Sequence, residues 1–204
     1  MGTTIKDTIC RFNFIMIKND TTVRDTQQEM ESEVKACRSL FEKKTRDYGT
    51  SWRILRLPSL TDQIYIKANR IRSIQESGQN RVGDNPRDEF VAMVNYATMA
   101  LIQLELGSDG EQELPLEQAL ALYDKHVGRT LKLMLDKNHD YGEAWRQMRV
   151  SSMVDLILMK LRRIKQIEDN DGRTIASEGV EGGYMDIINY SLFCLVRMTE
   201  GTDC

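Results

Sequence analysis

One ten-residue motif occurs twice in this chain. The sequence KTRDYGTSWR at residues 44–53 recurs as KNHDYGEAWR at residues 137–146, an offset of 93 residues. Both tryptophans of the protein, Trp52 and Trp145, lie in the two copies. An internal duplication constrains the fold more than local propensity does, because each copy must form the same unit and bury its apolar face against a neighbour. We therefore expect two copies of one supersecondary structure.

The positions that are identical in the two copies are largely polar, and they continue beyond the motif. Packing alone should preserve apolarity and volume, whereas here charges and amides are kept. The pattern therefore predicts a site that both copies share. The further matches, the last of them after a one-residue slip, are Arg56 with Arg149, Ser59 with Ser152, Asp62 with Asp155, Lys67 with Lys160, Arg70 with Arg163, and Asn95-Tyr96 with Asn189-Tyr190.

Composition narrows the class of protein. A hydrophobic content of 41% and a charged content of 29% are typical of a globular domain. The net charge of −3 disfavours direct nucleic-acid binding. The four cysteines, at positions 10, 37, 194 and 204, include no CxxC pair, and with only two histidines there is no zinc signature. We expect a reduced, cytoplasmic location and no membrane association, because the apolar run near the start is short and interrupted.

Each copy is expected to form three helices. Few prolines and many Leu, Ile, Met, Glu, Lys and Arg residues favour helix throughout. Gly49 and Gly142 should end the first helix of each copy, and Ser59 and Ser152 should cap the second. The third helix is apolar on most faces and should be central. The expected helices are residues 24–46, 59–77 and 87–106 in the first copy, and 116–138, 152–169 and 183–199 in the second.

The predicted fold is all-α: a tandem duplication of a three-helix unit that forms one helical bundle with pseudo-twofold symmetry. Residues 1–22 are expected to be a loosely attached lead-in. Residues 23–107 form the first repeat, 108–114 the linker and 115–201 the second repeat, together one globular domain. Such a chain resembles a homodimer fused into one polypeptide, and the whole is expected to be a monomer or a homodimer.

The motif has a purely structural interpretation. The glycines would end helices, the tryptophans would fill the gap between the first and second helices, and Tyr48 and Tyr141 would pack beside them. No ligand is needed for this, and aspartates would pair with arginines across the gap between helices.

A binding site is the alternative interpretation. Arginine forks and lysine ammonium groups suit phosphate oxygens, and a neighbouring aromatic ring suits a base. The expected ligand-binding residues are Lys44, Asp47, Tyr48, Trp52, Arg53, Lys67 and Arg70 in the first copy, and Lys137, Asp140, Tyr141, Trp145, Arg146, Lys160 and Arg163 in the second. Asp62, Asp155 and Asp186 are the candidate Mg²⁺ ligands, since Mg²⁺ is held by one or two carboxylates together with phosphate oxygens.

The two sites are not expected to be equal. Asp186 lies three residues before Asn189, so the two share one helix face, whereas the first copy has Ala92 and Asn95. The second copy should therefore be better suited to bind a metal.

The combined pattern K-x-x-D-Y-G-x-x-W-R and S-x-x-D-x-x-x-x-K-x-x-R resembles the nucleotide modification associated domain 1 family, in its duplicated form, over residues 30–200. This resemblance implies an association with nucleotide or modified-base metabolism. Helix order is also distantly similar to the MazG-like all-α nucleoside triphosphate pyrophosphatases, which bind Mg²⁺ through ExxE and ExxD pairs. The chain departs from that pattern: Glu29, Glu31 and Glu33 have the wrong spacing for the first pair, and Asp186 with Asn189 only approximates the second.

Two functions are therefore carried forward. The first is a protein that binds a nucleotide or another phosphorylated small molecule, with Mg²⁺-dependent pyrophosphohydrolysis as its enzymatic form. The second is a non-catalytic helical binding or scaffold module, in which the motif only organises the helix junction.

Overall fold

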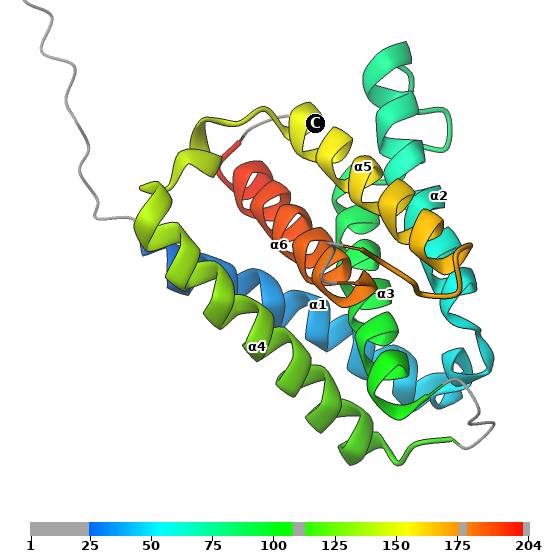
Figure 1. Ribbon diagram of the computed structural model, residues 1–204. Helices are drawn as coiled ribbons and strands as arrows, with labels where there is room; N and C mark the ends of the chain where they lie inside the picture. The colour runs from blue at the N-terminus through cyan, green and yellow to red at the C-terminus, as the bar shows by residue number, and fades with distance from the viewer. Residues whose placement is uncertain (1–24, 108–112, 176–178, 202–204) are drawn as a thin grey trace, which may run out of the picture.

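The computed structural model describes residues 25–107, 113–175 and 179–201, and within these ranges it contains helices and no strands (Figure 1). The first repeat consists of α1 (Thr26–Tyr48), the short 3-10 helix η1 (Ser51–Ile54), α2 (Leu57–Ser77) and α3 (Pro86–Leu106). The second repeat has the same order: α4 (Leu116–Tyr141), η2 (Ala144–Gln147), α5 (Val150–Glu168) and α6 (Val180–Thr199). The expected lead-in of residues 1–22 and most of the linker, residues 108–112, lie outside the described residues.

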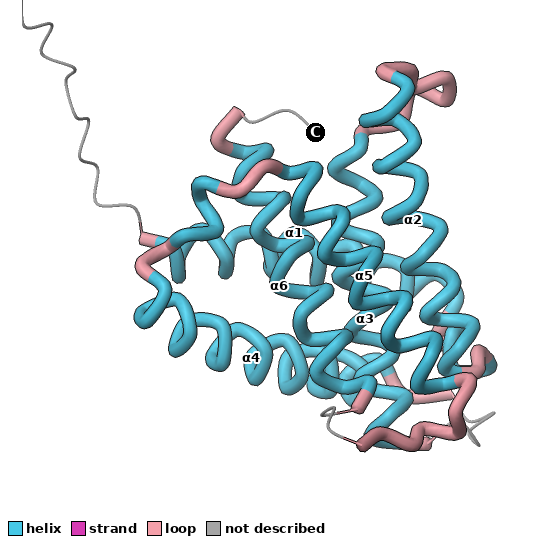
Figure 2. Tube along the Cα trace, turned by 45° about the horizontal axis from the view of Figure 1, so that its top comes forward, coloured by secondary structure: helices cyan, strands magenta, loops and turns pink. Residues whose placement is uncertain are grey.

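Each long helix contacts its own counterpart in the other repeat. The third helices α3 and α6 pack against each other at the centre, α2 packs against α5, and α1 packs against α4. The helices α2, α3, α5 and α6 form a four-helix group, and α4 runs along α1 beside it (Figures 1 and 2). The end of α2 and the start of α3 project beyond the rest of the bundle (Figure 2).

The ion pairs between α2 and α5 are reciprocal. Asp62 pairs with Lys165 at 2.5 Å, and Asp155 pairs with Arg72 at 3.7 Å. At the offset of 93 residues, Asp155 corresponds to Asp62 and Lys165 corresponds to Arg72. A twofold interface has this property, that residue i contacts j while j contacts i. The contacts therefore agree with the pseudo-twofold arrangement expected from the duplication.

One hydrophobic core runs through both repeats. Leu60 and Ile64 of α2 and Phe90 of α3 belong to the same buried cluster as Ile157 of α5 and Ile188 of α6. A smaller cluster around Phe41 and Tyr123 joins α1 to α4. The third helices are central, as their apolar sequences predicted. None of the described helices has the length and apolar character that crossing a membrane requires.

The helix ends were predicted in part. Gly49 and Gly142 end α1 and α4 with φ of 65° and 58°, the left-handed region expected for these glycines. The starts of the second helices were wrong: the N-caps are Arg56 and Arg149, with no side-chain hydrogen bond to the helix, and not Ser59 and Ser152. Pro58 occupies the first turn of α2, where a fixed φ and a missing N–H are tolerated. Ser59 and Ser152 therefore lie within the first turns of these helices and do not cap them.

Candidate functional site: two matched pockets

The structure has two pockets whose linings correspond position by position. The first has a volume of about 470 Å³ and the second about 450 Å³. Each lies where the end of the repeat's first helix, the 3-10 turn, the second helix and the third helix meet. The matched lining residues are Lys44 and Lys137, Thr45 and Asn138, Tyr48 and Tyr141, Trp52 and Trp145, Leu55 and Met148, Lys67 and Lys160, Ala92 and Asp186, Asn95 and Asn189, Tyr96 and Tyr190, and Met99 and Phe193.

The turn glycine positions the rim of the first pocket. The Gly49 N–H donates to the Thr45 carbonyl oxygen at 3.0 Å and ends α1, so that the chain turns back into η1. Lys44 and Tyr48 lie one helical turn apart before this glycine and therefore share a face. Tyr48 is 54% exposed, and Tyr141 at the same place in the second pocket is 74% exposed. Both rings are therefore accessible to a ligand.

Lys44 and Lys137 are exposed and carry unneutralised charge. In the described part of the chain, no carboxylate forms an ion pair with either of them. An ammonium group at the mouth of a pocket is suited to an anionic oxygen.

A second lysine in each pocket is neutralised by a carboxylate from the third helix. Lys67 Nζ lies 3.1 Å from Glu89 Oε2, and Lys160 Nζ lies 2.5 Å from Asp186 Oδ2. The two carboxylates come from different positions: Gly183 occupies the place of Glu89, and Ala92 occupies the place of Asp186. Glu89 was not predicted as a site residue because the second repeat has no carboxylate at the corresponding position. The available signal was that Glu89 and Asp186 lie one turn apart on the aligned third helices.

The tryptophans are buried and also line the pockets. Trp52 is 7% exposed and packs against Phe41, while Trp145 is 6% exposed and stacks on Phe193 with ring centroids 4.5 Å apart. The Trp145 indole N–H donates to Asn138 Oδ1 at 3.0 Å. The expected burial of both tryptophans at the junction of the first and second helices is confirmed.

The repeated asparagines differ in their hydrogen bonds. Asn95 is buried, donates to the Cys37 carbonyl oxygen at 3.1 Å and accepts from the Tyr123 hydroxyl at 2.8 Å. Asn189 Oδ1 is also enclosed, but no described residue donates to it. The residue that corresponds to Tyr123 is Met30, which has no hydroxyl. The two asparagines match between the repeats, but they were not among the residues predicted to bind a ligand.

The motif arginines hold the fold together and do not line the pockets. Arg53 is buried and donates to the Gln103 side chain and, at 3.3 Å, to the Gly107 carbonyl oxygen. Arg146 donates to Glu143 and Glu200, each at 2.7 Å, and to Glu29, and its guanidinium lies 4.4 Å from the Trp145 ring centre. These contacts favour the structural interpretation for Arg53 and Arg146.

Not all of the charged residues expected to bind a ligand line the two pockets. Asp47 and Asp140 are exposed outside the pocket linings, and so is Arg163. Arg70 binds Glu89 and, at 3.3 Å, Asp84. The second helices pair with each other through Asp62 and Asp155, and Arg70 binds the α2–α3 connection. Of the predicted binding residues on these helices, Lys67 and Lys160 line the pockets.

The three candidate metal ligands do not meet. Asp62 and Asp155 form the reciprocal ion pairs between α2 and α5, and only Asp186 lines a pocket. Within the residues described, there is no group of three or more His, Cys, Asp or Glu side chains placed to hold a metal ion. A Mg²⁺ site built from protein ligands alone is therefore not preformed here.

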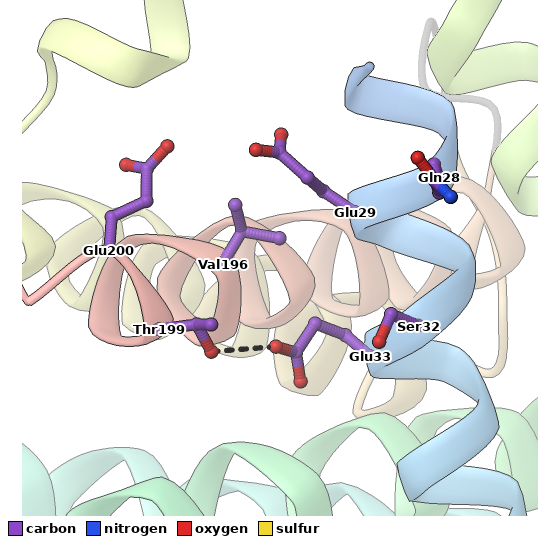
Figure 3. A pocket seen from close by; sticks show the side chains of 7 residues that line it. All are labelled: Gln28, Glu29, Ser32, Glu33, Val196, Thr199 and Glu200. Atoms are coloured by element: carbon purple, nitrogen blue, oxygen red, sulfur yellow. Dashed lines mark hydrogen bonds between the residues drawn. The ribbon is translucent and has the colours of Figure 1, made fainter. Parts of the chain in front are cut away.

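A third pocket, of about 390 Å³, lies between the start of α1 and the end of α6 (Figure 3). Glu29 and Glu33 from α1 face Thr199 and Glu200 from α6 across it. Glu33 accepts from Thr199 at 2.8 Å and from Arg87, and Arg146 neutralises Glu29 and Glu200. Its carboxylates therefore serve an ion-pair network within the protein.

Comparison with known proteins identifies the family. The profile described as "Nucleotide modification associated domain 1" matches residues 44–104 and 137–198, which together make up more than half of the chain. This chain belongs to that family. One matched segment lies in each repeat, and the two include most of the pocket linings, from Lys44 to Met99 and from Lys137 to Phe193. Neither a comparison with curated proteins nor one with solved structures found a significant match.

Proposed function

We propose that the two pockets bind a phosphorylated nucleotide. The observation that carries the proposal is that both pockets have the same lysine and tyrosine at the mouth, Lys44 with Tyr48 and Lys137 with Tyr141. Each pocket also contains a second lysine that is paired with a carboxylate. The volumes of 470 and 450 Å³ fall within the usual range for small-molecule sites, about 300–1,000 Å³. The family description, which concerns nucleotide modification, supports the same class of ligand.

The proposed roles follow from exposure and charge. Lys44 and Lys137 contact phosphate oxygens, since no carboxylate of the described residues neutralises them. Tyr48 and Tyr141 stack on a planar group, because an aromatic face accepts any base. Mg²⁺ enters with the phosphates of the ligand, and Asp186 is its candidate protein ligand, consistent with the usual mixture of one carboxylate and several phosphate or water oxygens.

Hydrolysis is the enzymatic form of this proposal. A MazG-like activity would release pyrophosphate from a nucleoside triphosphate in the presence of Mg²⁺. The rival is a non-catalytic module, which the structural roles of Arg53 and Arg146 favour. Ligand binding and pyrophosphate release are separate measurements, so that the two forms can be distinguished.

The test is a thermal-shift and calorimetric titration with nucleoside mono-, di- and triphosphates, with and without Mg²⁺. We expect a nucleotide to raise the melting temperature of the full chain, because it binds the native state only. The double substitution Lys44→Ala with Lys137→Ala should weaken binding by about 1.5–3 kcal/mol per site, the range for hydrogen bonds to charged groups. Lys43→Ala, the matched control, removes an exposed lysine outside the pocket lining and should leave binding unchanged. If no nucleotide shifts the melting temperature, the motif serves structure alone.

A further inference from the structure

One difference between the two pockets lies in the hydrogen bonds of their matched asparagines. In the first pocket, the Tyr123 hydroxyl donates to the side-chain carbonyl of Asn95, and the Asn95 amino group donates to the Cys37 carbonyl oxygen. In the second, Asn189 Oδ1 is enclosed and receives no hydrogen bond from the described residues. Asn95 therefore joins α3 to α1 and α4, whereas the amide of Asn189 does not serve the fold in this way.

An enclosed polar atom without a partner is unfavourable, and in native proteins such atoms are few. Leucine has the same number and branching of non-hydrogen side-chain atoms as asparagine and would avoid that cost. The asparagine is nevertheless present in the second repeat, at the wall of a cavity of about 450 Å³. A ligand that supplies the missing partner explains why this polar side chain occupies the site.

The surroundings of Asn189 suit a planar ligand. Trp145 and Phe193 form a stacked pair with an angle of 10° between their planes, and both line the pocket, as does Tyr190. In the first pocket, Met99 stands in the place of Phe193 and offers no ring. Lys137, at the mouth of the same pocket, carries the charge that suits a phosphate.

We propose that the pocket of the second repeat recognises the base of the nucleotide through Asn189, and that the first pocket does not discriminate between bases. This proposal rests on the proposed function. A side-chain amide offers one acceptor and two donors, which is complementary to a base edge that presents a donor and an acceptor side by side. Asn189 is then a specificity-determining residue, and its counterpart Asn95 is a structural one.

The experiment measures the dissociation constants of ATP, GTP, CTP and UTP for the full chain. Wild type should show a spread of at least about tenfold between the tightest and the weakest base, since each well-placed bidentate contact contributes about 1–3 kcal/mol of discrimination. Asn189→Leu should reduce the spread to less than about threefold while its melting temperature without ligand changes little. Asn189→Asp should change the order of the four bases, because a carboxylate accepts and does not donate.

Tyr123→Phe is the matched control. It removes the hydroxyl that donates to Asn95 and should lower the melting temperature without changing the base order or the spread. A spread that persists in Asn189→Leu, an unchanged order in Asn189→Asp, or four equal dissociation constants in wild type would each overturn base recognition by Asn189. Those results would leave nucleotide binding through Lys44 and Lys137 standing, whereas a lack of binding by any nucleotide would reject the proposed function itself.

Discussion

Single residues of the repeated motif serve two different purposes. Lys44 and Tyr48, with their counterparts, face the pockets, whereas Arg53 and Arg146 are built into the fold. The tryptophans do both, since they are almost fully buried and also form a pocket wall. Identity between the copies therefore does not separate pocket-lining residues from those that are built into the fold; exposure and hydrogen-bond partners do.

Replacing either tryptophan with alanine should destabilise the protein strongly. Trp52→Ala and Trp145→Ala each remove a large side chain that is less than a tenth exposed, and the expected loss is about 3–5 kcal/mol in the free energy of unfolding. Denaturant melts measure it. Tyr141→Ala, at a 74% exposed position, serves as the comparison and should change stability by less than about 1 kcal/mol. A loss below about 1 kcal/mol for both tryptophans would argue against their role in the core.

The two arginines Arg146 and Arg163 should behave in opposite ways. The Arg146 side chain is 11% exposed and bridges Glu29, Glu143 and Glu200, so its removal breaks three ion pairs of partly buried carboxylates. Arg146→Ala should cost about 1.5–3 kcal/mol, the range for losing hydrogen bonds to charged groups. Arg163→Ala, at an exposed position, should change the free energy of unfolding by less than about 0.5 kcal/mol. Equal effects in urea titrations of the two variants would contradict this assignment.

At the scale of the helices, periodicity and glycine positions predicted the order of the elements and the central place of α3 and α6. The starts of α2 and α5 were missed because Ser59 and Ser152 are good capping residues, whereas the N-caps are Arg56 and Arg149, which have no capping side chain. Only α2 has a proline, Pro58, in its first turn. The helices η1 and η2 were missed because four residues carry no periodic signal. The pockets could be anticipated from the repeated charges, but their lysine–carboxylate pairs could not, since Glu89 and Asp186 come from different positions of the repeat.

A polar contact among three helices predicts a pH dependence. Glu168 of α5 accepts from Thr61 of α2 at 2.7 Å and from Tyr184 of α6 at 3.1 Å. Burial raises the pKa of the Glu168 carboxyl above its ordinary value. The folded chain therefore holds this proton more tightly than the unfolded chain does, so that the associated stability is present at low pH and is lost as the pH rises through the folded pKa.

Glu168→Gln should remove that dependence, since glutamine still accepts both hydrogen bonds and does not ionise. Gln75, the residue at the matching position of the first repeat, already has this chemistry. The measurement is the free energy of unfolding from about pH 4 to pH 7, an interval that starts near the ordinary glutamate pKa of about 4.3 and extends above it. Parallel curves for wild type and Glu168→Gln would show that the carboxyl does not contribute to the pH dependence.

At the scale of the whole molecule, neither repeat encloses a core of its own. The main buried cluster takes residues from α2, α3, α5 and α6, and the smaller one joins α1 to α4. Because of the pseudo-twofold packing, each repeat needs the other to bury its apolar side chains.

The halves expressed as separate chains, residues 25–107 and 113–201, should each be unfolded or self-associated. Mixed together, they should form a helical one-to-one complex, because the buried apolar surface and the reciprocal Asp62–Lys165 and Asp155–Arg72 pairs lie between them. Circular dichroism and size-exclusion chromatography with light scattering detect the outcome. A monomeric half with a cooperative melt would show that one repeat is an independent domain.

The hydroxyl of Tyr123 also illustrates how substitutions can affect one of the two duplicated sites and not the other. In an assembly of two identical chains, every substitution appears at both sites. A tyrosine that donates a hydrogen bond to one asparagine would therefore do the same to the other. Here the tyrosine lies at position 123 and a methionine lies at position 30. Within one chain the two positions can differ, so that Asn95 is hydrogen-bonded into the framework while Asn189 Oδ1 has no partner among the described residues. A protein of this design can keep a working site and alter its twin by single mutations.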